Sequence, residues 1–186
     1  VDPIDSDQLI LVDEADKEVG HLGKADCHAG GGILHRAFSL FIFNANGELL
    51  LQQRSPRKRL WPNYWSNSCC SHPRLGESMT AAIHRRLMEE LGLSCTLRYL
   101  FKFQYQARYD EATSEHELCS VFYGCGATRV RPNGEEIAAV RWLSPQALQR
   151  EIASGVEHFT PWFKLEWERI GRDHLEQILI PGGMPA

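Results

Sequence analysis

Three histidines and two glutamates are the side chains of this sequence best suited to binding a divalent metal ion. His28, His35 and His72 lie in or beside loop-like segments, and Glu115 and Glu117 stand at the start of an apolar stretch. On a β-strand, two residues spaced in this way point to the same face. Two carboxylates so close repel one another unless a cation lies between them. Imidazoles and carboxylates together suit Mn²⁺, Mg²⁺ or Zn²⁺. Taken singly, each histidine is better explained as an ordinary surface or core residue than as a metal ligand. The two glutamates alone are explained equally well as part of a solvent-facing strand edge.

A second group of charged residues surrounds a predicted helix. Its spacing matches most of a Nudix box, in which glutamates of one helix bind a metal ion against a diphosphate; the matching residues are Glu77, Arg85, Glu89, Glu90 and Gly92. Two positions differ, because Ser71 stands where the box begins with glycine and Arg86 replaces a glutamate. Arg86 and Glu90 share a helical face, so they form either a surface ion pair or a diphosphate site. In such a site Glu90 would hold a substrate-bound metal and the Arg86 fork would contact phosphate oxygens.

The cysteines give one catalytic candidate and a clue to location. Cys70 lies two residues before His72. A lone cysteine is usually a small buried hydrophobe, but the neighbouring candidate ligand favours a catalytic role for this one. We expect the adjacent Cys69 to serve in packing. The six cysteines follow no disulfide-scaffold spacing, which predicts free thiols and a cytoplasmic location.

The elements that must position these residues are predicted as a mixture of strands and helices. Apolar stretches predict strands at residues 9–12, 37–43, 48–54, 97–108, 117–127 and 140–143. Residues 44–47 predict a hairpin turn, and residues 55–65 a long loop. A helix is expected over residues 78–91, ended by Gly92, with further helices starting at Ser144-Pro145 and Thr160-Pro161. We therefore expect a single α+β domain spanning residues 1–186, with its core at about residues 9–170 and a loose tail at 181–186.

Composition excludes several functional classes. The 186 residues are 43% hydrophobic and 24% charged, as in an ordinary globular domain. A net charge of −4 disfavours nucleic-acid binding. No apolar run reaches the roughly 18–20 residues that span a bilayer, and the first twenty residues show no secretory signal. No flavin or nicotinamide motif is present. We expect a monomer that binds a small molecule and neither membrane nor nucleic acid.

From about residue 9 to residue 167 the sequence resembles the type I isopentenyl-diphosphate isomerase family of the Nudix superfamily. The most specific parts of the resemblance are residues 67–73, NSCCSHP, and residues 115–119, EHELC. Further positions with the same spacing are Lys24, His28, His35, Arg54, Lys58, Arg85, Arg86, Glu89, Glu90, Tyr105 and residues 160–162.

The resemblance implies a fold, two metal sites and a substrate. The expected fold is a Nudix-like sandwich, a mixed β-sheet flanked by helices. One divalent metal, Mn²⁺, Mg²⁺ or Zn²⁺, would be bound by His28, His35, His72, Glu115 and Glu117. Glu90 would help to hold a second, substrate-bound Mg²⁺. The residues matching the diphosphate-binding positions are Lys24, Arg54, Lys58 and Arg86. Cys70 and Glu117 match the two catalytic positions, on opposite sides of the substrate double bond.

The implied reaction is the interconversion of isopentenyl diphosphate and dimethylallyl diphosphate, which supplies isoprenoid biosynthesis. A proton must be added to one end of an unactivated alkene and another removed from an allylic carbon, so two proton-transfer groups must flank the hydrocarbon. The carbocation-like intermediate requires a dry cavity. Trp162 would either stabilise this cation, by about 2 kcal/mol when desolvated, or act as a hydrophobic plug. Tyr105 would either hydrogen-bond Glu117 or simply pack in the core.

Two other functions compete with this interpretation. A Nudix diphosphate hydrolase would use water as the nucleophile, but Arg86 in place of a box glutamate argues against it. A non-catalytic metal-stabilised binding module would tolerate the loss of Cys70. We also predict that the Gly30–Gly32 segment becomes ordered only when metal binds, because glycine has the most backbone freedom to lose. The remaining candidate histidines are expected to be solvated or structural; they are His84, His116, His158 and His174.

Overall fold

The computed structural model describes residues 7–126 and 129–179. Its strands are β1 Gln8–Val12, β2 Glu18–Gly23, β3 His35–Phe43, β4 Leu49–Arg54, β5 Trp65–Ser66, β6 Cys69–Ser71, β7 Leu97–Arg108, β8 Ser114–Cys125 and β9 Ile137–Leu143. Its helices are α1 Lys24–Cys27, α2 Met79–Leu91, α3 Pro145–Ser154, α4 Pro161–Asp173 and α5 Leu175–Leu179. The tail expected at residues 181–186 lies outside the described part, as does residue 127 at the end of one predicted strand.

The strand β3 is the centre of a mixed sheet. Along its whole length it pairs in parallel with β8, which forms a long antiparallel hairpin with β7. Its other edge is shared by β1, β6 and β4, each of them antiparallel to it. The sheet continues from β4 to β5 and β9. The expected α+β fold with a mixed sheet flanked by helices is confirmed.

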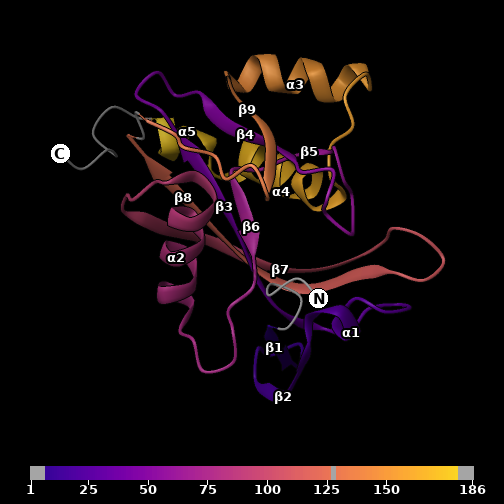
Figure 1. The fold of residues 1–186 in the computed structure, drawn as a ribbon. Helices are drawn as coiled ribbons and strands as arrows, with labels where there is room; N and C mark the ends of the chain where they lie inside the picture. Colours follow the sequence, from indigo (N-terminus) through magenta and orange to yellow (C-terminus); the bar gives the residue numbers. More distant parts are fainter. Residues whose placement is uncertain (1–6, 127–128, 180–186) are drawn as a thin grey trace.

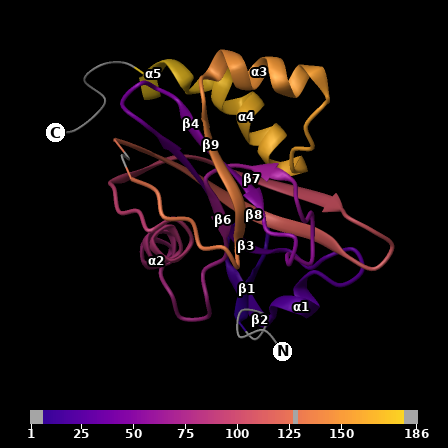
Figure 2. The same cartoon turned by 45° about the horizontal axis from the view of Figure 1, so that its top comes forward.

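Alternate residues of β3 belong to two different cores, because successive side chains of a strand point to opposite faces. Phe38, Leu40 and Ile42 pack with the apolar stripe of α2, whereas Phe41 and Phe43 pack with α4 and α5. Figures 1 and 2 show α2 on one side of the sheet and α3, α4 and α5 gathered on the other. Each face of the sheet is therefore covered, and the second face is the one that carries the site.

The predicted helix starts and strands are largely confirmed. Ser78 caps α2 by accepting the Ala81 amide at 3.2 Å, and Gly92 ends that helix with a φ of 62°. Ser144 caps α3 in the same way. Thr160 does begin α4, but its hydroxyl is no cap, because it hydrogen-bonds the Ser66 hydroxyl at 2.9 Å. That contact ties the start of α4 to β5.

The hairpin expected around residues 44–47 is only partly formed. The turn is present, but the ladder of β3 and β4 contains a single pair, Phe43 with Leu49. The reason is that β6 occupies the same edge of β3 at residues 38–40, and β4 turns away to pair with β9. The short elements β2, α1, β5 and β6 were not predicted, because their polar or very short segments carry no hydrophobic periodicity. None of the helices within residues 7–126 and 129–179 is long and apolar enough to cross a membrane.

Candidate functional site

The five predicted metal ligands converge. His28 follows α1, His35 begins β3, His72 follows β6, and Glu115 and Glu117 lie on β8. One side-chain ligand atom from each lies within 4.8 Å of all the others. The convergence follows from the sheet, because His35 is the register partner of Glu117 and β6 lies on the other edge of β3.

Backbone hydrogen bonds orient the imidazoles toward the centre of this cluster. His28 Nδ1 lies 2.6 Å from the Lys24 carbonyl, and His35 Nδ1 lies 2.7 Å from the Ile33 carbonyl. In both rings Nε2 is left to face the carboxylates. Such a bond from the far ring nitrogen is typical of metal-binding histidines. His28 Nε2 lies 2.7 Å from Glu115 Oε2, while the buried His35 Nε2 has no hydrogen-bond partner within the described residues.

The ionisation states also fit a cation site. Burial lowers the pKa of the His72 imidazole to about 4, although its hydrogen bond to Glu117 opposes this shift. Burial alone would raise the pKa of the Glu117 carboxyl, but the nearby His35 imidazole and the hydrogen bond with His72 hold it well below its usual range. A neutral imidazole and an ionised carboxylate are the forms that bind metal. The donor set and the unpartnered His35 nitrogen therefore fit a divalent cation.

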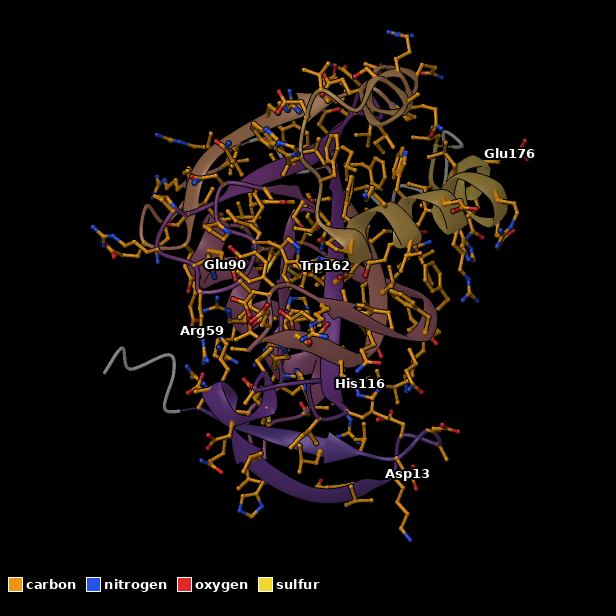
Figure 3. The ribbon with its side chains drawn as sticks, turned by 90° about the vertical axis from the view of Figure 1, so that its right-hand side faces the viewer. Asp13, Arg59, Glu90, His116, Trp162 and Glu176 are labelled. Atoms are coloured by element: carbon orange, nitrogen blue, oxygen red, sulfur yellow. The ribbon has the colours of Figure 1, made fainter. Side chains whose placement is uncertain are left out.

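A cavity of about 320 Å³ opens beside this cluster and brings together nearly all the predicted site residues. Four of its lining residues are the predicted catalytic ones, Cys70, Tyr105, Glu117 and Trp162. The predicted diphosphate-binding cations also line it: Lys24, Arg54, Lys58 and Arg86. In Figure 3 Trp162 lies near the middle of the molecule, where α4 begins. A thiol, a carboxyl and a group of cations thus share one cavity.

The Cys70 thiol lies on the α4 side of the sheet. Its β6 position is the register partner of Ser39, and its Sγ is 3.8 Å from the nearest Arg54 guanidinium nitrogen. Burial raises the pKa of this thiol to about 12, although Arg54 opposes the shift. At neutral pH the thiol is protonated and can therefore donate a proton. Cys69, next to it in the chain, is completely buried in the α2 core.

Aromatic residues build the wall around Glu117. The Tyr105 hydroxyl donates a hydrogen bond to Glu117 Oε2 at 2.6 Å, which is the first of the two alternatives considered for this residue. The Tyr105 and Trp162 ring centroids are 6.2 Å apart, and Trp61 packs edge-on against Trp162 at 5.3 Å. Trp162 is fixed by a hydrogen bond from its Nε1 to Asn67 Oδ1 at 3.3 Å. The site is polar at its carboxyl and aromatic around it.

Some of the cationic side chains in the cavity already bind other groups of the protein. Arg54 donates to the carbonyls of Leu60 and Trp61, and this holds the loop that follows β4 in place. Burial and the nearby Lys58 lower the pKa of Lys24. Lys58 itself is ion-paired with Glu136. The cavity is therefore basic, but partly neutralised from within.

Glu136 is a residue of the site that the sequence did not reveal. It forms ion pairs with both Lys58 and Arg86, and these hold the pKa of its carboxyl at about 2 against the effect of burial. Arg86 also pairs with Glu90, which is 1% exposed and lies outside the cavity lining. An acidic residue after a turn, just before β9, gave no spacing signal that could have identified Glu136. Further unpredicted lining residues are Arg57, Arg59, Asn133 and Glu135.

The histidines expected to have no role in the site lie outside the cluster. His84 and His158 are exposed, and His116 and His174 are half-buried. The Gly30–Gly32 segment is held against β8 by hydrogen bonds from the Gly30 amide to Ala112 and from the Ser114 hydroxyl to Gly30. Gly32 has a φ of 76°, and an added Cβ there would lie 3.0 Å from the His116 Cβ. Glycine is thus required at this close approach.

Comparison with known proteins places these features in one family. The NUDIX domain pattern matches residues 33–163. The chain is 43% identical over 174 residues to isopentenyl-diphosphate Delta-isomerase 1 of Photorhabdus laumondii, covering 92% of this chain and 99% of that protein. It is 41% identical over 165 residues to isopentenyl-diphosphate Delta-isomerase of Burkholderia multivorans, covering 89% and 93%.

Solved structures show the same fold. The crystal structure of DR0079 from Deinococcus radiodurans superposes with a TM-score of 0.71 at 25% identity, covering 87% of this chain and 98% of that one. The MutT protein of Methanosarcina mazei gives a TM-score of 0.61 at 21% identity, covering 75% and 94%. The expected Nudix-like architecture is confirmed.

Proposed function

The chain belongs to the isopentenyl-diphosphate Delta-isomerase family, within the Nudix superfamily, and from this premise we propose how its cavity carries out the reaction. The reaction is the interconversion of isopentenyl and dimethylallyl diphosphate, which supplies isoprenoid biosynthesis. The observation that supports the proposed mechanism best is that Cys70 and Glu117 line one cavity together with four cationic side chains.

In the proposed reaction the two ends of the alkene are handled by different groups. One group adds a proton to the terminal CH₂, which breaks the π bond and leaves a tertiary carbocation. The other removes a proton from the carbon between the cation and the CH₂O group, and those electrons form the new double bond. Cys70, protonated at neutral pH, and Glu117, ionised, are the complementary pair for these two steps.

The cations are proposed to bind the diphosphate. Lys24, Lys58 and Arg86 offer ammonium and guanidinium donors along one cavity, and Arg54 adds its guanidinium beside Cys70. For Lys58 and Arg86 to bind phosphate oxygens, their ion pairs with Glu136 must be loosened or shared. For Glu90 to hold a substrate-bound Mg²⁺, Arg86 must likewise give up part of its contact with that carboxyl.

The aromatic wall is proposed to protect the carbocation. Trp61, Tyr105 and Trp162 form a contiguous group around the cavity, which would exclude water that traps the cation. The Trp162 face would also attract positive charge, by about 2 kcal/mol in a desolvated setting. The Tyr105 hydroxyl holds one oxygen of Glu117, so that the other is oriented toward the imidazoles.

We propose that His28, His35, His72, Glu115 and Glu117 hold one divalent metal, which can be Mn²⁺, Mg²⁺ or Zn²⁺ on ligand type. When bound, it would supply positive charge that fixes the Glu117 carboxyl and lowers its proton affinity. We further propose a single-domain monomer with its core at about residues 9–170. Six cysteines that form no disulfide support a reducing, cytoplasmic setting.

The test is to incubate the protein with isopentenyl diphosphate and Mg²⁺ in heavy water. We expect dimethylallyl diphosphate with deuterium in a methyl group and no free phosphate. Release of phosphate or of a monophosphate would instead identify a hydrolase. Binding without turnover would identify a non-catalytic module. The Cys70→Ala variant, assayed in parallel, should give no labelled product.

A further inference from the structure

A buried carboxyl that the proposed mechanism does not use lies behind the reaction face. Glu166 is on α4, four residues after Trp162, so the two side chains share one face of the helix. It is completely buried. Its Oε1 accepts a hydrogen bond from the Cys119 thiol at 3.6 Å, and its Oε2 has no hydrogen-bond partner within residues 7–126 and 129–179.

The polar group around Glu166 involves β8, which carries Glu117, and β3, which pairs with the strand of Cys70. Cys119 lies two residues after Glu117 on β8, on the same face of the sheet. The Cys119 thiol also lies 3.6 Å from the Ser39 hydroxyl. Ser39 is the β3 register partner of Cys70. This polar group therefore links the helix that carries Trp162 to β8, which carries Glu117, and to β3, which pairs with the Cys70 strand β6.

This arrangement costs stability. A buried carboxyl with one weak thiol donor and one unpartnered oxygen loses its hydration without full compensation. Burial accordingly raises the pKa of Glu166 to about 8, and the nearby Ser39 hydroxyl and the Cys119 thiol oppose this only in part. The rest of this face of α4 is apolar, with Phe163, Trp167 and Ile170 buried in the same core. Packing alone would favour an apolar side chain here.

We infer that Glu166 is a positioning residue of the isomerisation: through Cys119 and Ser39 its carboxyl holds α4, and with it Trp162, in register with the sheet face that carries Cys70 and Glu117. The inference rests on the proposed roles of those three residues. The hydrogen bonds of Thr160 and Trp162 tie only the start of α4, and Glu166 adds a polar contact one turn further along, where the buried neighbours are apolar. Without this contact α4 can rotate about its tethered first turn, since apolar packing is not directional. The Trp162 indole would then be misplaced relative to the carbon on which positive charge develops.

The test compares Glu166→Gln with Glu166→Met, two side chains of nearly equal length that differ in their polar end. Gln keeps an oxygen that can accept from the Cys119 thiol, so its kcat should stay within about threefold of wild type. Met should lower kcat by about tenfold or more with KM within about twofold, because the diphosphate contacts are unchanged. Its melting temperature should equal or exceed that of the wild type. Glu168→Gln, on the exposed face of α4, is the matched control and should change neither kcat nor the melting temperature.

Two results would overturn the inference. One is a Met variant with wild-type kcat. The other is an equal fall in kcat and melting temperature for both variants, which would indicate a packing role alone. Should the Met variant fail to fold, Ser39→Ala provides the readout: kcat reduced at constant KM supports the inference, and unchanged kcat refutes it. A wild type that makes labelled product, and a Cys70→Ala variant that makes none, would keep the proposed function intact in either case.

Discussion

Cys69 and Cys70 are neighbours in the chain, yet their side chains lie on opposite faces of β6. Cys70 lines the cavity and packs against the core on the α4 side, whereas Cys69 is buried in the core under α2. The difference follows from the alternation of side chains along a strand. The proposed catalytic residue Cys70 and the packing residue Cys69 are therefore adjacent in the chain. Substituting each of them by alanine gives a matched pair of variants.

We expect Cys70→Ala to reduce turnover by at least about a thousandfold, because alanine has no proton to donate, while the melting temperature falls little. Cys69→Ala should keep kcat within about threefold and lose about 1 kcal/mol of unfolding free energy for the small cavity it creates. Steady-state kinetics and urea unfolding of both variants measure the two effects. An active Cys70→Ala enzyme would remove this thiol from the mechanism.

At the residue scale, the sequence predicted the side chains that line the cavity better than those that lie behind them. The five predicted metal ligands converge as expected, and Tyr105 does hydrogen-bond Glu117. Glu136 and Glu166 were missed, since each acts on other side chains brought near only by the fold. The spacing of Glu166 four residues after Trp162 was a usable signal, because it places a carboxyl on the buried face of that helix.

At the scale of elements, local sequence patterns predicted the helices and the long strands. They did not predict which strands share one edge of β3. The turn at residues 44–47 predicts a hairpin, and only the tertiary competition between β4 and β6 for the edge of β3 shortens it. The segment that leads into β6 has no alternation of apolar and polar residues from which a strand could have been predicted. Pairing with β3 creates β6, and thereby places Cys70 beside the cavity.

The Gly30–Gly32 segment, between two metal ligands, gives a prediction at this scale. We expect its amides to exchange slowly with deuterium when metal is bound and at least about tenfold faster after chelation, because glycine-rich backbone regains much freedom when released. Hydrogen–deuterium exchange of residues 28–35, with and without Mn²⁺, measures this. The centre of β3, residues 38–42, serves as the internal control and should be unaffected.

The existing contacts of this segment sharpen that test. Gly30 is hydrogen-bonded to Ala112 and Ser114, so the hairpin tip of β7 and β8 should loosen together with it. Equal exchange of residues 28–35 in both states would show that these hydrogen bonds alone hold the segment, and the proposed coupling of its order to metal would be wrong.

At the scale of the whole molecule, an acidic chain encloses a basic cavity. The net charge is −4, yet six lysine and arginine side chains line the pocket, which are Lys24, Arg54, Arg57, Lys58, Arg59 and Arg86. Four glutamates line the same cavity, namely Glu115, Glu117, Glu135 and Glu136, so the positive charges are in excess but not alone. An excess of positive charge in a cleft raises the local concentration of an anionic substrate. The net charge disfavours nucleic-acid binding, but it could not predict the excess of positive charge in the cavity. A net charge does not say where the individual charges lie.

The buried Glu166 makes the stability of the molecule depend on pH. Its pKa is about 8 when folded against an ordinary value of 4.5, so the folded chain binds this proton more tightly. Unfolding therefore releases a proton between those two values, and the free energy of unfolding falls as pH rises through this window. Relative to Glu166→Gln, the wild type should lose up to about 1.4 kcal/mol per pH unit.

Urea unfolding of both proteins at pH 5.5 and 7.5, with chelator present, measures this difference. Other titrating groups, such as His72, are common to the two proteins and cancel. Glu168→Gln, which alters an exposed carboxyl of the same helix, should show no such trend. A difference between wild type and Glu166→Gln that stays constant across the two pH values would mean that Glu166 is ionised in the folded state.

In the proposed reaction the substrate hydrocarbon lies between the Cys70 thiol and the Glu117 carboxyl. A crystal structure of the inactive Cys70→Ala variant with isopentenyl diphosphate and Mg²⁺ tests it directly. We predict the alkene between the methyl group of residue 70 and Glu117, next to Trp162, with the diphosphate on Lys24, Lys58 and Arg86. An alkene lying outside this gap, or residue 70 and Glu117 on the same side of the double bond, would contradict the account.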